Sequence, residues 1–345
     1  MLELLTKYHA IQNEISMKTI FIKFIILMVI SVSLLLLPSC GSSISSPDTK
    51  QIPKTVPHVN RWGIYALDIV GKKVELLYSS ETKIAYLNLN KRGDRFAFSQ
   101  LFGGNSNENE EICIFDLIDG KLQRLTNNDL WDIYPVWSAD GTKIAFLTLR
   151  DQNLDVFVMG KDGSNQQKLF DSGYHDADID WAGDRIVFTA RSRIWIMRDD
   201  GTDIVQVTEP TDAGVWGNAN LPFGDYDPRL SPDGSKIAFE RLEDDVSPHG
   251  NYNIYVIGTD GSDEARLTNS GYSQGIVSWS HSGDKMVFVV AAIGDEGKYD
   301  IYMMNSDGSN ITNITPDYFP ADFLCYTPVF SKDDSKIFFI GEWWE

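Results

Sequence analysis

Two short hydrophobic patterns alternate along the chain. One is an apolar segment that ends in Phe, and the other is a four-residue run rich in β-branched and aromatic residues. Each occurs six times: the first at Phe96–Phe98, Ile144–Phe146, Ile186–Phe188, Ile237–Phe239, Met286–Phe288 and Ile337–Phe339, the second at Ile64–Leu67, Ile112–Phe115, Val156–Met159, Ile194–Met197, Ile254–Ile257 and Ile301–Met304. Such runs between turn residues predict strands. The chain opens on the second pattern and closes on the first, so its ends hold complementary halves of one repeat.

The best-formed copy predicts four antiparallel strands at Tyr134–Trp137, Lys143–Leu149, Asp155–Met159 and Gln167–Phe170. A glycine recurs at the turn between the third and fourth strands, where a backbone with positive φ is cheap for glycine. Its copies are Gly71, Gly120, Gly163, Gly201, Gly261 and Gly308. We therefore predict an all-β fold, a six-bladed β-propeller of four-stranded antiparallel blades. In the blade that closes the ring, Trp62–Tyr78 would supply the outer strands and Thr327–Ile340 the inner ones.

The segments Trp137–Phe146 and Leu230–Phe239, each followed by an apolar strand and an Asp-Gly turn, resemble the propeller repeat of the TolB family. The resemblance covers about Arg61 to Glu345. It implies a propeller of the cell envelope that binds a protein or peptide. TolB proteins carry an α/β domain before the propeller, for which this chain has no room, so the similarity is to TolB-like propeller lipoproteins.

The N-terminal region predicts export. Lys18 and Lys23 accompany an apolar run from Ile20 to Leu37, which is the form of a signal peptide. The segment Leu37–Cys40 resembles the lipobox of bacterial lipoproteins, which implies lipid on Cys40. We expect a signal peptide at 1–40, with residues 1–16 as a possible misannotated start before Met17, a flexible tether at 41–60 and the propeller at 61–345. A single transmembrane anchor is the alternative, because the apolar run is long enough to span a bilayer.

The composition limits the classes of partner that the protein can bind. The formal net charge is −19, which argues against a nucleic-acid partner because phosphates require Lys and Arg. Of the 3 Cys, Cys113 and Cys325 are expected on different strands of neighbouring blades, too far apart for a disulfide. We interpret both as buried small hydrophobic residues.

Loop lengths differ between the two faces of the predicted ring. Turns between the first and second and between the third and fourth strands are short, whereas the other connections vary, with the longest at Glu209–Asp225. We expect this variable-loop face to be the working surface. Carboxylates concentrate there at one side of the channel mouth, at Asp132, Asp176, Asp178, Asp225 and Asp227. They could bind Ca²⁺, at Asp176, Asp178, Asp225 and Asp227, or a basic segment of a partner; alternatively, each only bonds backbone at the start of its strand.

Aromatic residues neighbour these carboxylates, at Trp131, His175, Trp216, Phe223 and Tyr226. Exposed rings next to carboxylates suit a peptide or a sugar. By contrast, we interpret Trp137, Trp181 and Trp279 as core between blades.

Catalytic signals in the sequence are weak. It contains no His-Glu-x-x-His segment, and its Gly-x-Ser-x-Gly segment, Gly271–Gly275, leads into an expected inner strand and not into a helix, so it lacks the context of a nucleophile elbow. We expect a monomeric, non-catalytic lipoprotein that binds an envelope protein or peptide without a required cofactor. The alternative is a carbohydrate-binding or polysaccharide-lyase-like propeller, in which His175, His249 and His281 would cluster around a metal.

Overall fold

The computed structural model describes residues 60–102, 109–151, 153–217, 219, 221–244, 250–291, 299–320 and 322–344. They belong to one compact unit, Val59–Glu345. The signal peptide, Cys40, His249 and the tether up to residue 59 lie outside the described residues. In the described part of the chain, none of the segments is a helix with the length and hydropathy that a membrane crossing needs.

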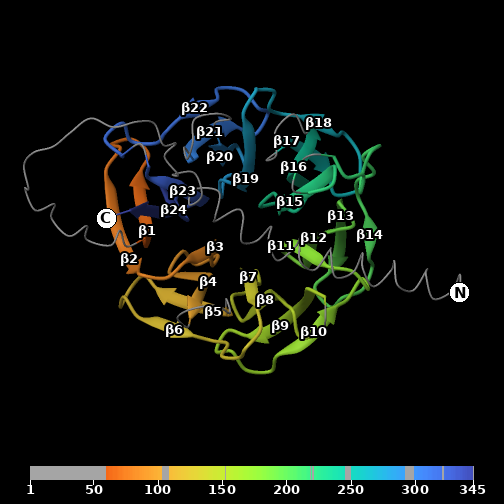
Figure 1. The fold of residues 1–345 in the computed structure, drawn as a ribbon, viewed down its shortest axis with the longest axis horizontal. Coiled ribbons are helices and arrows are strands. Elements are labelled where there is room, and N and C mark those ends of the chain that lie inside the picture. The colour runs from red at the N-terminus through yellow and green to blue at the C-terminus, as the bar shows by residue number, and fades with distance from the viewer. Residues whose placement is uncertain are drawn as a thin grey trace, which may run out of the picture. The chain divides into compact units, whose positions relative to one another are not determined.

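The described residues form six four-stranded antiparallel sheets arranged as the blades of a ring (Figure 1). The prediction of a six-bladed all-β propeller is confirmed. In chain order the strands are β1 (Asn60–Asp68), β2 (Val74–Ser80), β3 (Ile84–Leu89), β4 (Arg95–Phe102), β5 (Asn109–Asp116), β6 (Leu122–Arg124), β7 (Asp132–Trp137), β8 (Lys143–Thr148), β9 (Asp155–Gly160), β10 (Gln167–Phe170), β11 (Asp176–Ala182), β12 (Arg185–Ala190), β13 (Arg193–Arg198), β14 (Val205–Gln206), β15 (Gly224–Leu230), β16 (Lys236–Asp244), β17 (Asn251–Gly258), β18 (Ala265–Arg266), β19 (Ser273–Trp279), β20 (Lys285–Ala291), β21 (Tyr299–Asn305), β22 (Thr312–Asn313), β23 (Leu324–Phe330) and β24 (Lys336–Trp344).

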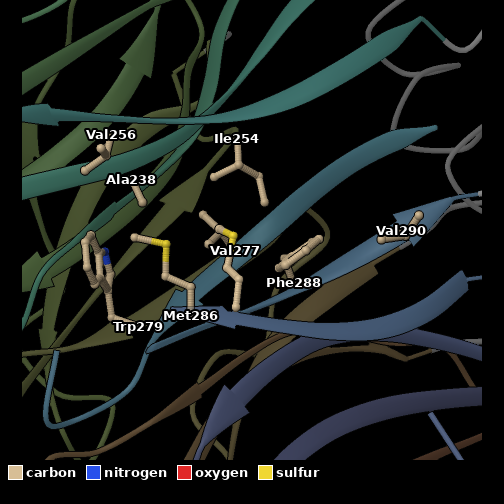
Figure 2. Packing of buried hydrophobic residues seen from close by; sticks show 9 residues of the cluster. Ala238, Ile254, Val256, Val277, Trp279, Met286, Phe288 and Val290 are labelled. Carbon is tan, nitrogen blue, oxygen red and sulfur yellow. The ribbon is translucent and has the colours of Figure 1, made fainter. Parts of the chain in front are cut away.

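Hydrophobic layers between adjacent blades make the core. The recurring Phe of each second strand is among the largest fully buried side chains, as at Phe146, Phe188 and Phe288. Figure 2 shows one layer, in which Ala238 and Ile254 of one blade pack with Trp279, Met286 and Phe288 of the next. Burying one such aromatic ring contributes about 1.5–3 kcal/mol. The interpretation of Trp279 as core between blades agrees with this packing.

One blade is built from both ends of the ring. Strand β1 pairs with β24 over nine positions, from Asn60 opposite Trp344 to Asp68 opposite Lys336, and β2 lies outside β1. This is the closure that the complementary chain ends predict. Cys113 and Cys325 are both buried free thiols, also as predicted.

Each innermost strand contains a β-bulge. The antiparallel register shifts by one residue in the middle of β3, β7, β11, β15, β19 and β23. At every shift one non-glycine residue has a φ between 44° and 60°, namely Tyr86, Tyr134, Asp178, Asp227, Ile276 and Thr327. Such a backbone costs on the order of 1–3 kcal/mol, and bulges redirect side chains. The bulges therefore change the direction of side chains in the middle of each innermost strand.

Candidate site in the central channel

Three of the predicted carboxylates lie inside their blades. Asp132 and Asp176 are the first residues of β7 and β11, Asp225 is the second residue of β15, and none of the three is exposed to solvent. Asp132 accepts hydrogen bonds from Arg150 at 2.8 Å and Asn128 at 2.7 Å. In the same way Asp225 accepts from Arg241 at 2.5 Å. Asp132 and Asp225 thus bond side chains, whereas Asp176 accepts the backbone N–H of Ser172 at 3.4 Å, the kind of bond that the alternative interpretation expected.

Asp178 and Asp227 meet in the channel. The backbone N–H of Asp227 donates to Oδ2 of Asp178 at 3.3 Å, which links two adjacent blades. Oδ1 of Asp227 lies 2.8 Å from Nη2 of Arg229 and also accepts a hydrogen bond from the hydroxyl of Tyr134. Tyr134 belongs to β7, two blades away from β15, so this contact crosses the channel. Oδ2 of Asp227 is buried without a hydrogen-bond partner.

Two further acids complete this channel cluster. Oδ2 of Asp180 accepts from the backbone N–H of Leu230 at 2.8 Å, and Oε2 of Glu240 accepts from that of Ile276 at 3.2 Å. A Cβ on Gly275 would lie 1.6 Å from Oε2 of Glu240, so any larger residue there would displace this carboxyl. We define the channel cluster as Asp178, Asp180, Asp227, Glu240, Arg229 and Tyr134.

The channel cluster holds more acid than base. Four carboxyl groups face one guanidinium. Burial, followed by the nearness of Asp227, raises the pKa of Asp178 and raises that of Glu240 well above its ordinary value. Burial also raises the pKa of Asp180. Groups of this kind release protons readily when a cation approaches, because the cation stabilises the ionised form.

The predicted aromatic residues separate in the structure. Tyr226 is buried, and its hydroxyl donates to the carbonyl of Pro222 at 2.6 Å. Nδ1 of His175 accepts the backbone N–H of Leu154 at 3.0 Å. Trp131 and Phe223 are half-buried, whereas Trp216 is 44% exposed. Trp216 is thus the member of this group that presents a largely free ring to solvent.

Exposed apolar side chains recur at the variable-loop end. Leu130, Tyr174 and Tyr272 are each seven residues before a tryptophan at or next to the end of an inner strand, and they are 39%, 52% and 48% exposed. Together with Trp216 they make what we call the apolar rim. The guanidinium of Arg191 lies 3.8 Å from the ring centre of Tyr174. Sequence reasoning missed the three repeated positions, although aligning the blades on the tryptophan would have shown them.

A cavity of about 230 Å³ lies at the opposite end of the channel. Its wall runs from the bulges to the short first turns of the blades, including Ser138, Gly183 and Ser280. Arg229 and Asp180 of the channel cluster also line it. The expectation that the variable-loop face is the working surface therefore leaves out a second opening, at the short-turn end.

Calcium binding stays a prediction. Among the described residues no group of three or more His, Cys, Asp or Glu side chains is placed to hold a metal ion. Asp176 and Asp225 bond within their blades, and Asp178 and Asp227 belong to the channel cluster. Sequence reasoning also missed Arg229, Glu240 and Asp180 as site residues. The available signal was the charged residue two positions after the bulge in β11 and β15.

Sequence comparisons relate the chain to one uncharacterized protein. No model of a known protein family matches the chain. An uncharacterized protein of Agrobacterium fabrum is 25% identical over 182 residues, which is 49% of this chain and 58% of that protein, so the chain matches little more than half of that relative's length.

Solved structures agree on a propeller. A TolB from Agrobacterium tumefaciens has a TM-score of 0.64 at 18% identity, covering 82% of this chain and 99% of that one. TolB from Acinetobacter baumannii has a TM-score of 0.57 at 17% identity, over 74% of this chain and 63% of its own. An oligogalacturonate lyase in complex with manganese has a TM-score of 0.52 at 13% identity, covering 81% and 82%. At these identities the likeness concerns the fold. The chain therefore has a six-bladed β-propeller fold that is similar to the fold of these TolB structures.

Proposed function

We propose that this chain is a non-catalytic envelope lipoprotein that binds a protein or peptide through the apolar rim. The observation that carries the proposal is the exposure of Leu130, Tyr174, Trp216 and Tyr272 on the loops that enter successive inner strands. Aromatic side chains on a rigid scaffold supply contact area at low entropic cost, and they dominate the binding energy of many interfaces. The TolB-like fold supports a binding role. The lipobox-like segment at Cys40 supports an anchor at the membrane.

Replacing rim residues tests the proposal. The double variant Tyr174→Ala and Tyr272→Ala should lose cross-linking to its envelope partner, with a photoreactive group placed at Trp216. Val70 and Ile118 are 94% and 80% exposed on outer turns, so the double variant Val70→Ala and Ile118→Ala is the matched control. If both double variants lost cross-linked product equally, or if neither lost any, the apolar rim would not be the binding surface.

A carbohydrate ligand is the second candidate. The rings of Tyr174, Trp216 and Tyr272 are exposed enough to stack on sugar faces. An oligogalacturonate lyase has a similar fold, and its substrate is therefore a suitable sugar for a binding test. Oligogalacturonate should then quench the fluorescence of Trp216, and a lyase would also produce an unsaturated product that absorbs in the ultraviolet. A response by neither readout would leave the protein partner as the better account.

A further inference from the structure

The cavity at the short-turn end combines aromatic walls with an acidic floor. Five aromatic side chains line it, namely Tyr86, Tyr134, Trp137, Trp181 and Trp279. Asp180 lines it directly, Asp227 and Glu240 contact the lining residues Arg229 and Ile276, and Asp178 accepts the backbone N–H of Asp227. At about 230 Å³ it is smaller than the roughly 300–1,000 Å³ of drug-sized sites. It therefore suits a small molecule or one long side chain.

Arg229 and Lys91 are the Arg and Lys residues of the cavity wall, and they do not balance the negative charge of the carboxyl groups. Arg229 is already engaged by Asp227 at 2.8 Å, by the hydroxyl of Tyr134 at 2.9 Å and by the carbonyl of Pro228 at 2.9 Å. Lys91 is exposed on a turn, where water screens its charge. The channel cluster thus has three more carboxyl groups than guanidinium groups, and Oδ2 of Asp227 has no hydrogen-bond partner.

Aromatic rings and carboxylates together favour the binding of organic cations. A cation over a ring face is attracted by about 0.5–2 kcal/mol, most when it is desolvated. The wall already contains such a contact, since Cζ of Arg229 lies 5.4 Å from the ring centre of Tyr134. We propose that this cavity binds an organic ammonium ion, either a small free cation or the side chain of a lysine in a peptide. The apolar rim belongs to the other end of the channel, so this site is separate from the proposed partner surface.

Choline and its neutral carbon isostere, dimethylbutanol, test the charge. Choline should change the fluorescence of the cavity tryptophans in a saturable way, whereas dimethylbutanol at the same concentrations should not. A short peptide with one lysine should compete with choline, and a peptide that binds more tightly than choline would identify a polypeptide as the source of the cation. Equal responses to choline and dimethylbutanol, or no response to either choline or the lysine peptide, would overturn the proposal.

Asp180→Asn removes one charge and keeps the oxygen that accepts the N–H of Leu230. It should weaken choline binding about tenfold, within the range of a desolvated cationic contact. Asp184→Asn is the matched control, because Asp184 is 64% exposed at the same end of the same blade and bonds Arg198. Asp180→Asn with an unchanged melting temperature and unchanged choline affinity would overturn the proposal.

The same binding should depend on pH. Choline should bind the unmodified protein more tightly at about pH 8 than at about pH 6, because burial raises the pKa of Asp178 and of Asp180, and protonation removes their charge. The titratable and charged groups around the cavity are Lys91, Asp178, Asp180, Asp227, Glu240, Arg229, Tyr86, Tyr134 and His281. Tighter binding at the lower pH would contradict an acidic floor.

Discussion

Near the start of β11, a buried and an exposed aspartate have pKa shifts of opposite sign. The pKa of the buried Asp176 is raised, and that of the exposed Asp171 is lowered. Asp176 is fully buried, and its Oδ1 has no hydrogen-bond partner. Burial raises its pKa to about 7. Because this value is above the roughly 3.9 of an unfolded Asp, the folded state binds the extra proton, and Asp176 makes stability fall as pH rises from about 4 to 7.

Asp176→Asn should therefore stabilise the protein above neutral pH. We expect a gain on the order of 1–3 kcal/mol in the free energy of unfolding at about pH 8 and a smaller effect at about pH 5. Urea unfolding at the two pH values measures both.

Asp171→Asn is the control with the opposite sign. Asp171 bonds Lys168 at 3.0 Å and the N–H of Gly173 at 2.7 Å, and these contacts lower its pKa. A lowered pKa contributes stability above the unfolded value, so the Asn variant should be less stable at about pH 8. The account of Asp176 would be wrong if both variants shifted stability in the same direction.

At the scale of the element, the closing pair β1 and β24 depends on two glycines opposite each other. Gly63 pairs with Gly341, and aromatic rings cover the pair. A Cβ on Gly341 would lie 2.5 Å from Cζ of Phe323 and 2.7 Å from Cε2 of Tyr65. Those rings pack on each other at 5.5 Å, which restricts their retreat.

Gly341→Ala should accordingly destabilise the ring by about 1–3 kcal/mol, the usual cost of overpacking. Gly271→Ala is the matched control, because no atom lies within 4 Å of a Cβ there. Urea midpoints of both variants give the comparison. Equal midpoints would show that the rings over Gly341 yield without cost.

Deleting residues 60–80 tests closure itself. The nine paired positions of β24 would become an open edge, and open edges associate with other chains. We expect a lower melting temperature and self-association in size-exclusion chromatography, relative to a chain that begins at Val59. A monomer with an unchanged melting temperature would contradict the observed closure.

At the scale of the whole molecule, the proposed lipid on Cys40 would hold the propeller at a membrane. Cys40→Ser should move the protein from the carbonate-washed membrane fraction to the soluble fraction, because serine lacks the thiol to which the proposed lipid would be attached. Ser46→Ala serves as the control and should stay with the membrane. Retention of Cys40→Ser would favour a transmembrane anchor at Ile20–Leu37.

The fold could be predicted from the sequence because local rules set it. Strand runs such as Val156–Met159 and turns such as Asp162–Gly163 depend on neighbouring residues, and their repetition six times leaves a ring as the simple solution. The complementary chain ends likewise determined that β1 would pair with β24. Asp178 and Asp227 were also identified from their place in the repeat.

The site required the tertiary structure. Tyr134 and Asp227 are 93 residues apart, and only closure of the ring brings them together across the channel. The bulges add a residue to each inner strand, so counting along the sequence cannot say which acids face the channel and which, like Asp132, turn into the blade. The exposure of Tyr174 and Tyr272, and the burial of Tyr226, depend in the same way on neighbouring blades that no local pattern encodes.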